Sequence, residues 1–166
     1  TARFSLAGRV LAHAGIVAIA LRAVADSTGE PETTGSIAVG EQVDVEGFVL
    51  TLESVRRADG SNYLADEARL VVSGRANGVL EPQRRFYTAA ETTTREVAIR
   101  SGLAGDLYVS LGEPRPRENG EIAYEVRASF NPMVWLLGLG AGLIVLGGLC
   151  AVAGVATSAR AQEGRA

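Results

Sequence analysis

The sequence has only one cysteine and one histidine, and these scarcities exclude several kinds of site. Cys150 has no second cysteine with which to form a disulfide, a CxxC redox pair or a cysteine-based zinc site, so we expect it to pack or to face lipid. His13 lies in an apolar N-terminal segment, far from the polar middle of the chain. No Ser, His and acid triad and no glycine-rich phosphate loop is visible, so we expect no catalytic residue in this chain.

Lysine is absent, and all 16 basic residues are arginine, a bias that more simply reflects a GC-rich genome than a special chemistry. The net charge is -3, and no concentrated basic face is visible. Nucleic-acid binding requires such a face, because it depends on neutralising phosphates, so no nucleic-acid partner is expected. With 166 residues, the chain has room for one modest domain and its anchors.

Acidic residues are nearly absent from both ends of the chain. All but one of the 19 lie between Asp26 and Glu125, and Glu163 is the exception. The mean hydropathy is +0.16 although 21% of the residues are charged. Apolar and polar residues are therefore segregated along the chain, which favours a membrane protein.

The C-terminal apolar segment predicts a transmembrane helix. Residues 134–156 contain neither a charge nor a proline, and they exceed the roughly 20 residues that a helix needs to cross the hydrocarbon core. Glycines at 138, 140, 142, 147, 148 and 154 would let a partner helix approach closely. The alternative is that this helix is simply glycine-rich, as many membrane helices are.

Residues 4–24 predict a second span that carries three polar side chains. Arg9 and Arg22 lie near its ends, where arginine can extend to the headgroups. At about 1.5 Å per residue, His13 falls near mid-membrane, and an ionisable group at that depth is a functional-site hypothesis. A secretory signal peptide is the alternative, but it fits poorly because no compact cleavage site follows and His13 interrupts the apolar run.

The basic residues near the ends predict an orientation. Arg3 and Arg9 flank the first span, and Arg160 and Arg165 follow the last, so both termini should be cytoplasmic, although Arg22 runs against this count. The expected organisation is a transmembrane helix with His13 over 1–25, a linker over 26–36, an extracytoplasmic β domain over 37–130, a second transmembrane helix over 131–157 and a cytoplasmic tail over 158–166.

The middle of the chain predicts about six short strands. Apolar and polar residues alternate over 42–52, 68–73, 84–88, 96–99, 106–111 and 121–127. Turn signals separate the strands at 59–61, 76–78 and 113–116, and Asn77-Gly78 is typical of a type I′ hairpin. The fold class is therefore a membrane protein of α plus β type, with two transmembrane helices flanking a small antiparallel β-barrel or sandwich.

Three pairs of adjacent charged residues lie in or between these strands: Asp66-Glu67, Arg56-Arg57 and Arg84-Arg85. Adjacent residues in a strand or turn point apart, so the two carboxylates of Asp66-Glu67 do not form a joint site. We expect these carboxylates to lie on a solvated edge and the arginines to be surface or edge-strand charges rather than ligand-binding residues.

The order of several short motifs resembles the C-terminal end of the CcmF-type cytochrome c haem lyases, the CcmF/NrfE family of cytochrome c-type biogenesis proteins. Each motif is weak by itself, but together they follow one another over nearly the entire chain. They are Leu-Ala-His-Ala-Gly at 11–15, Gly-Ser-Asn-Tyr at 60–63, Leu-Glu-Pro-x-Arg-Arg-x-Tyr at 80–87, a Thr-rich stretch at 92–99, Asp-Leu-Tyr-Val-Ser-Leu-Gly-Glu at 106–113 and Asn-Pro-x-Val-Trp at 131–135.

The resemblance implies a component of the system I cytochrome c maturation machine in the bacterial inner membrane. It would take haem from a haem chaperone and help attach it to apocytochrome c on the periplasmic side. The implied partners are the remainder of the haem lyase, the haem chaperone, and apocytochrome c with its thioreduction and presentation subunit. The other haem-handling residues of the family do not occur here, so we expect a fragment or the product of a split gene.

For the cofactor, the resemblance implies haem b, with iron axially ligated by His13 and by a histidine from outside this chain. The chemistry agrees, because neutral imidazole is a common axial ligand of haem iron. Ala12, Ala14 and Gly15 are small enough to let a macrocycle approach, and Arg9, one turn before His13, could pair with a propionate.

Other interpretations remain open. His13 could instead bond to a neighbouring helix or carry protons, and the chain would then be a non-enzymatic, membrane-anchored β-domain subunit for assembly or sensing. A processed lipid-binding or envelope protein is a third interpretation, in which the first apolar segment is a signal.

Overall fold

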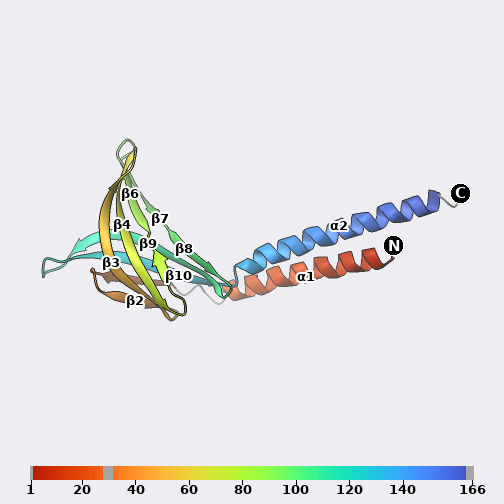
Figure 1. Cartoon of the computed structure of the whole chain (residues 1–166), viewed down its shortest axis with the longest axis horizontal. Coiled ribbons are helices and arrows are strands. Elements are labelled where there is room, and N and C mark those ends of the chain that lie inside the picture. Colours follow the sequence, from red (N-terminus) through yellow and green to blue (C-terminus); the bar gives the residue numbers. More distant parts are fainter. Residues whose placement is uncertain (1, 28–31, 164–166) are drawn as a thin grey trace. The chain divides into compact units, whose positions relative to one another are not determined.

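A computed structural model describes the backbone of residues 2–27 and 32–163, and the side chains of residues 6–25 and 32–156. The chain forms two compact units, one made of Thr1–Gly29 with Pro132–Ala166 and the other of Glu30–Asn131. The first is helical and the second consists of strands (Figure 1).

The helical unit contains α1 (Ala2–Ser27) and α2 (Trp135–Glu163), which run antiparallel. The backbones of the two helices touch. A Cβ on Gly15 would lie 2.5 Å from the carbonyl oxygen of Gly140, and one on Gly147 would lie 2.6 Å from that of Gly8. The glycines are seven residues apart in each helix, a spacing that keeps one face turned to the partner. The expected partner of α2 is therefore α1.

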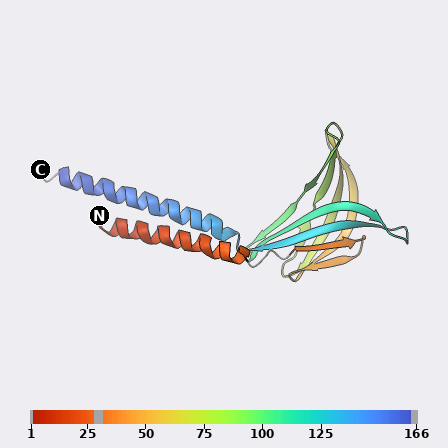
Figure 2. The same cartoon turned by 180° about the vertical axis from the view of Figure 1, so that it is seen from behind.

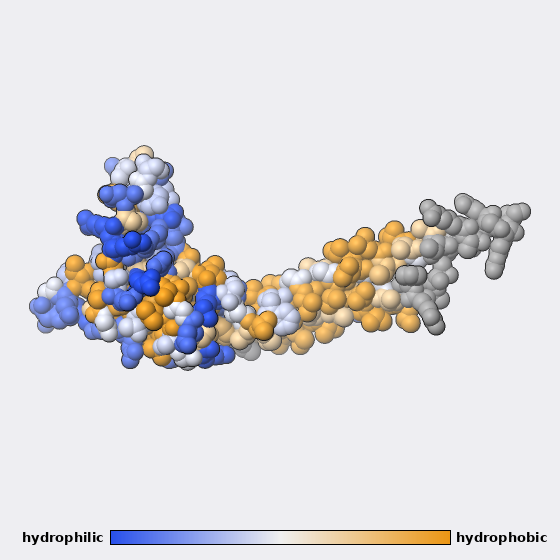
Figure 3. All heavy atoms as spheres, in the orientation of Figure 1, coloured by the Kyte–Doolittle hydropathy of each residue, from blue (hydrophilic) through white to orange (hydrophobic). Residues whose placement is uncertain are grey.

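The face of the two helices that is seen in Figure 3 is mostly apolar. The segments Leu6–Ala25 and Trp135–Ala156 are long and apolar enough to cross a membrane, and only 22% and 17% of their apolar windows are buried. A core helix of a water-soluble protein would bury most of such a surface. The segments begin and end within two residues of the spans predicted from the sequence.

The β unit is a sandwich of two antiparallel sheets. One sheet has the order β1-β10-β9-β8, and the other has the order β2-β3-β4-β6-β7 with β5 beside β4. The strands are β1 (Glu32–Ile37), β2 (Gln42–Val45), β3 (Phe48–Asp59), β4 (Tyr63–Gly74), β5 (Gly78–Leu80), β6 (Gln83–Tyr87), β7 (Thr92–Glu96), β8 (Ala98–Gly102), β9 (Gly105–Pro116) and β10 (Ile122–Pro132).

The core of the sandwich is built from alternating residues of both sheets. Leucine and valine side chains that point inward from β3, β4, β9 and β10 are fully buried, as expected when every second residue of a strand faces the interior. The largest of them are Leu50, Leu52, Leu70, Leu107, Leu111 and Val126. The predicted fold class is confirmed as its sandwich form.

Two of the sequence predictions were wrong about where strands begin and end. The stretch 26–36, expected to be a linker, contains β1, which pairs with β10. The stretch 42–52, expected to be one strand, is a hairpin in which Glu46 and Gly47 adopt φ of 53° and 77°. Positive φ at both central residues is the signature of a type I′ turn. The turn is hard to detect in the sequence because the alternation of apolar and polar residues continues on both sides of it.

Two predicted turns also differ from the structure. Asn77-Gly78 is not a type I′ turn, because neither residue has positive φ and the connection from β4 to β5 is longer. Pro114 and Pro116 lie within β9, which reverses only after Pro116 in the long hairpin with β10 (Figure 2). Strand β8 pairs with β9 only as far as Val109, so these prolines occupy an open strand edge, where a missing N–H is tolerated.

The glycine contacts predict opposite effects on stability for a Gly→Ala variant of α1 and one of α2. Gly15→Ala should destabilise the helix pair by about 1–3 kcal/mol, because its new methyl group meets backbone that cannot move aside. In Gly142→Ala the new methyl group meets open space. This variant should be neutral or stabilising by up to about 1 kcal/mol, since alanine favours a helix. Unfolding in mixed micelles, followed by circular dichroism, measures both. Equal effects would exclude the backbone contact.

The β9–β10 loop predicts an acid-dependent step in stability. Arg117 donates two hydrogen bonds, of 2.7 and 2.8 Å, to the Glu41 carboxylate, which also accepts one from the Ala38 N–H. The Arg117 hydrogen bonds, followed by that of Ala38, lower the pKa of Glu41 to about 2. A carboxyl with a lowered pKa stabilises the fold above its unfolded pKa, near 4.5, and this stability is lost as the pH falls towards 2.

NMR titration of the Glu41 carboxyl carbon checks this prediction. In the parent chain the carboxyl should remain ionised at pH 3.5, whereas in Arg117→Gln its pKa should rise towards the ordinary value. Arg57→Gln is the control, because its side chain contacts Asp66 and not Glu41. A Glu41 pKa that is the same with and without Arg117 would contradict the assignment.

Candidate functional site

His13 makes one local hydrogen bond that sets the state of its ring. Its Nδ1 lies 2.7 Å from the carbonyl oxygen of Arg9, one helical turn earlier. A carbonyl oxygen only accepts hydrogen bonds, so Nδ1 must carry a proton and donate it. In the neutral ring the lone pair is then on Nε2. Such a second bond is how proteins commonly orient a metal-binding histidine.

The ring of His13 lies on the face of α1 that α2 does not cover. Gly8, Gly15 and Ala18 are buried along the covered face, whereas His13 is exposed together with its apolar neighbours one turn away. Those neighbours are Val10, Ile16 and Val17. Nε2 is therefore available to a group outside this helix pair.

The small residues around His13 have a different role from the one expected. Gly15 contacts Gly140, and Ala12 contacts Gly147, with a Gly147 Cβ position only 3.1 Å from the Ala12 Cβ. Their small size serves the contact between α1 and α2. Ala14 is exposed, and it is the only one of the three that stays open beside the ring.

The two arginines of α1 differ in their surroundings. Arg9 is exposed and lies one turn before His13 on the same face, as the spacing predicts. Arg22 is only 7% exposed, so its side chain does not spread over the outer surface as the sequence suggested. It belongs to the repeat of buried positions that includes Gly8 and Gly15, a pattern that glycine spacing could have revealed.

Among the described residues, no three His, Cys, Asp or Glu side chains come close enough to hold a metal ion together. A metal bound at His13 would need its other ligands from a prosthetic group or another segment. Cys150 is half-buried on the α1 side of α2, where its Cβ lies 3.4 Å from the position that a Cβ on Gly8 would take. This agrees with the packing role expected for it.

The Asp66-Glu67 pair does not lie on a solvated edge, whereas the side chains of Arg56 and Arg57 are 71% and 90% exposed, as expected for surface charges. Asp66 and Glu67 belong to β4, which has β3 on one side and β6 on the other. They point to opposite faces, as predicted, and meet different partners. Glu67 is buried. Its carboxylate accepts a 2.7 Å hydrogen bond from the Nε of Arg56 and another hydrogen bond from the side-chain amide of Gln83.

Asp66 lies between two other arginines on the opposite face. Its carboxylate oxygens are 3.7 Å from Arg57 and 3.5 Å from Arg84. The register of β3, β4 and β6 places these residues directly opposite one another, so the charges form cross-strand pairs. The sequence alone could not show this, because the pairing of the strands was unknown.

The chain matches the family model described as the CcmF C-terminal beta-sandwich over residues 28–132. It belongs to the CcmF family. The family assignment made from short motifs is thereby confirmed. The matched range includes all ten strands and excludes nearly all of the two helices.

Similar curated proteins are all much longer than this chain. The cytochrome c-type biogenesis protein CcmF of Pseudomonas fluorescens is 35% identical over 87% of the chain and 22% of its own length. CcmF of Escherichia coli K12 is 31% identical over 88% and 22%, and NrfE of Haemophilus influenzae is 26% identical over 92% and 24%. The chain thus spans about a fifth of the length of these relatives.

A solved structure titled cytochrome c haem lyase CcmF has the same fold. It superposes with a TM-score of 0.66 at 21% identity and covers 90% of this chain and 25% of the other. At this identity the similarity establishes the arrangement of helices and strands alone.

The buried carboxylate of β4 predicts a difference between two Glu→Ala variants. Glu67→Ala should lower the free energy of unfolding by about 2 kcal/mol, because Arg56 and Gln83 lose a charged acceptor. Glu81→Ala should cost less than about 1 kcal/mol, since Glu81 is exposed and its partner Arg69 keeps Glu53. Thermal unfolding followed by the β-sheet circular dichroism signal compares them. A larger loss for Glu81→Ala would refute the ranking.

Proposed function

We propose that this chain acts as the C-terminal part of a cytochrome c haem lyase, which helps bind haem and attach it to apocytochrome c on the periplasmic side of the inner membrane. The observation that carries the proposal is the outward Nε2 of His13, in a chain of the CcmF family whose relatives are named for cytochrome c biogenesis. The chain has one histidine, so it supplies one ligand and the rest of the lyase supplies the others.

The surroundings of His13 fit haem b with two axial imidazoles. The Arg9 carbonyl holds the Nδ1 proton, so the lone pair of the neutral ring is on Nε2, in a side chain that is exposed. Exposed Val10, Ile16 and Val17 offer an apolar surface to a porphyrin and to a further helix that carries the second histidine. When bound, the haem would supply an iron centre for one-electron transfer in a buried, apolar site.

Arg9 is proposed to bind a haem propionate. It lies on the same face of α1 as His13 and one turn away, within reach of the edge of a macrocycle ligated there. A guanidinium group favours carboxylates because its N–H donors match the two oxygens. Its position near the end of the span also lets the charge reach the headgroup region.

The sandwich is proposed to be the periplasmic docking module. The basic residues near the chain termini favour cytoplasmic ends, which would place the domain between α1 and α2 outside the cytoplasm. There it would meet the haem chaperone, apocytochrome c with its thioreduction and presentation subunit, and the remainder of the lyase. The ranges 1–25, 131–157 and 158–166 remain our proposed spans and tail, whereas the domain between the spans begins with β1 and replaces the linker that the sequence predicted over 26–36.

His13→Ala tests the proposal in the complete haem lyase that contains this chain. Loss of an axial ligand should remove most of the haem b that copurifies with the lyase, or convert its low-spin spectrum into a high-spin one. Leu21→Ala is the control, because Leu21 is an exposed apolar residue of α1 two turns after His13, outside the apolar surface proposed for the porphyrin, and it has no ligand atom. The reduced pyridine haemochrome spectrum measures the haem content per lyase.

The outcome distinguishes the two main interpretations of His13. Loss of haem in His13→Ala with normal haem in Leu21→Ala supports ligation. Unchanged haem content and spin state in His13→Ala would refute it and leave the chain as a membrane-anchored assembly or sensing subunit with a structural histidine.

A further inference from the structure

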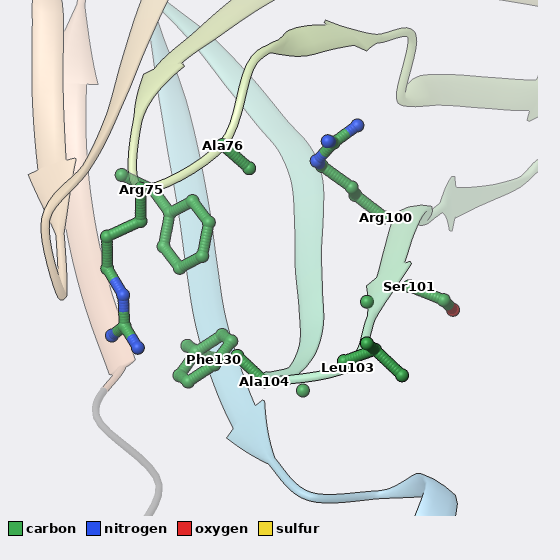
Figure 4. Close-up of a pocket in the computed structure, with 10 residues that line it drawn as sticks. Arg75, Ala76, Arg100, Ser101, Leu103, Ala104 and Phe130 are labelled. Carbon is green, nitrogen blue, oxygen red and sulfur yellow. The ribbon is translucent and has the colours of Figure 1, made fainter.

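One cavity of the β unit, of about 180 Å³, is lined by two arginines and by Phe130 (Figure 4). These arginines, Arg75 and Arg100, form no ion pair with a carboxylate within the described residues. Their guanidinium groups lie on opposite sides of the cavity and point away from each other (Figure 4). The two charges therefore do not form a joint site for one ligand.

The strand β7 (Thr92–Glu96) has an open edge. β6 pairs with all five residues of β7 on one side, and the sheet continues no further on the other side among the described residues. In an antiparallel sheet, the N–H and C=O groups of successive residues point to alternate sides of the strand. Two or three residues of β7 therefore direct both main-chain groups away from the sheet, where a further strand could pair with them.

Two other strand edges of the β unit have features that hinder such pairing. The part of β9 beyond its pairing with β8 contains Pro114 and Pro116. The part of β3 beyond its pairing with β2 has a bulge at Glu53 and the adjacent charges Arg56 and Arg57. Prolines, bulges and charges commonly protect an edge strand. β7 contains neither a proline nor a bulge, and it begins with three threonines, which favour a strand.

The register of the sheet places β7 at the end of two rows of side chains. Residues directly opposite each other on neighbouring strands lie side by side on one face. On β4 this face carries the buried core residues further along the strand, so the two rows extend the inner face of the sheet beyond the core. The rows are Asp59–Leu64–Phe86–Thr93 and Arg57–Asp66–Arg84–Arg95.

The first row favours an apolar residue in a strand added beside β7. Leu64 is 50% and Phe86 38% exposed, and a hollow of about 250 Å³ lies beside them. Thr93 is exposed and small, and neighbouring strands lie about 4.8 Å apart. A long apolar side chain opposite Thr93 would therefore reach across it and cover part of the Phe86 ring.

The second row favours an acidic residue two positions away on the same face. Arg84 and Arg95 lie directly opposite each other, and Arg84 has Asp66 on its other side, at 3.5 Å. Arg95 lies 3.6 Å from Glu125, a carboxylate that it shares with Arg115. A carboxylate opposite Arg95 in the added strand would form a further cross-strand ion pair, whereas a basic residue there would be repelled.

We propose that β7 binds an unfolded segment of apocytochrome c as an added strand, with an apolar residue opposite Thr93 and an acidic residue opposite Arg95. The proposal rests on the proposed function, in which this polypeptide is the substrate. A segment that is to receive haem must be open to the lyase, so its main-chain N–H and C=O groups are available for pairing. Strand addition binds such groups, and the side chains of the edge provide the selectivity.

Amide hydrogen exchange of the full chain in micelles, followed by NMR, tests this edge. The probe is unfolded apocytochrome c with its cysteines alkylated, and folded holocytochrome c is the comparison. With saturating apocytochrome c, the outward N–H groups of β7 should exchange about tenfold more slowly, because exchange then requires the new hydrogen bonds to open. Holocytochrome c should leave their exchange unchanged. Equal protection by both proteins, or by neither, would overturn the proposal.

A proline in β7 tests the main-chain pairing itself. The N–H groups of Thr93 and Thr94 point to opposite sides of the strand, so their exchange rates in the free chain identify the outward one. Replacing that residue, as Thr93→Pro or Thr94→Pro, removes a donor to the added strand but no hydrogen bond to β6. The other outward amides of β7 should then lose their protection by apocytochrome c. Undiminished protection in a folded proline variant would contradict strand addition.

Arg95→Gln tests the expected ion pair without a change to the main chain, and it decides the outcome if the proline variant fails to fold. It should weaken the binding of apocytochrome c by up to about fivefold, the contribution of one cross-strand ion pair. Arg57→Gln is the matched control, because Arg57 is in the same row, three strands away from β7, and its side chain is 90% exposed. Equal affinities of the two variants would overturn the proposal.

The concentration of the chain distinguishes apocytochrome c from a second copy of this protein. If protection of β7 rises with chain concentration when apocytochrome c is absent, the edge is a contact between two copies and the proposal fails. None of these measurements involves haem or His13. Failure at β7 therefore leaves the test of His13 unaffected, and unchanged haem in His13→Ala leaves the binding measured at β7 unaffected.

Discussion

The direct contact between the backbones of α1 and α2 determines what the helical unit can present to other molecules. Gly8 and Gly15 face Gly147 and Gly140, and no side chain larger than hydrogen fits between them. Because the helices touch here, α1 cannot rotate about its axis without losing these contacts. The rotation of α1 then decides that His13 and Arg9 lie on the uncovered face. The local bond from His13 to the Arg9 carbonyl places the ring proton on Nδ1, which leaves the lone pair of the neutral ring on Nε2 of an exposed side chain.

The arginines of the β unit fall into two groups: those that pair with carboxylates and those that do not. Along β4 the carboxylates are held between arginines of neighbouring strands, and Glu41 is held by Arg117, so these charges stabilise the sandwich and are not free for a ligand. At the cavity beside Phe130 the arginines lack such partners within the described residues. This contrast shows which arginines of the described residues are balanced by a carboxylate. It is visible only once the strands are paired.

Much of the architecture could be predicted from the sequence because membrane spans and alternating strands leave periodic signals. Both spans, the sandwich class and the family follow from residues 4–24, 134–156 and a few motifs. The hairpin at Glu46-Gly47 and the strand through Pro114 could not be predicted, because each depends on its neighbour in the sheet rather than on local composition. For the same reason, Glu67 was mistaken for an edge residue. For the proposed site, the sequence suggested His13 and Arg9, but it could not show that Ala12 and Gly15 are in contact with α2.

The protonation state of the His13 ring is the most direct test of the account. The chain has a single histidine, so ¹⁵N-histidine labelling gives the signals of His13 alone. NMR of the labelled chain in micelles should show that the neutral ring carries its proton on Nδ1 and its lone pair on Nε2, because Nδ1 donates to the Arg9 carbonyl. A neutral ring with its proton on Nε2 would contradict the account, since the nitrogen that faces outward could not then bind iron.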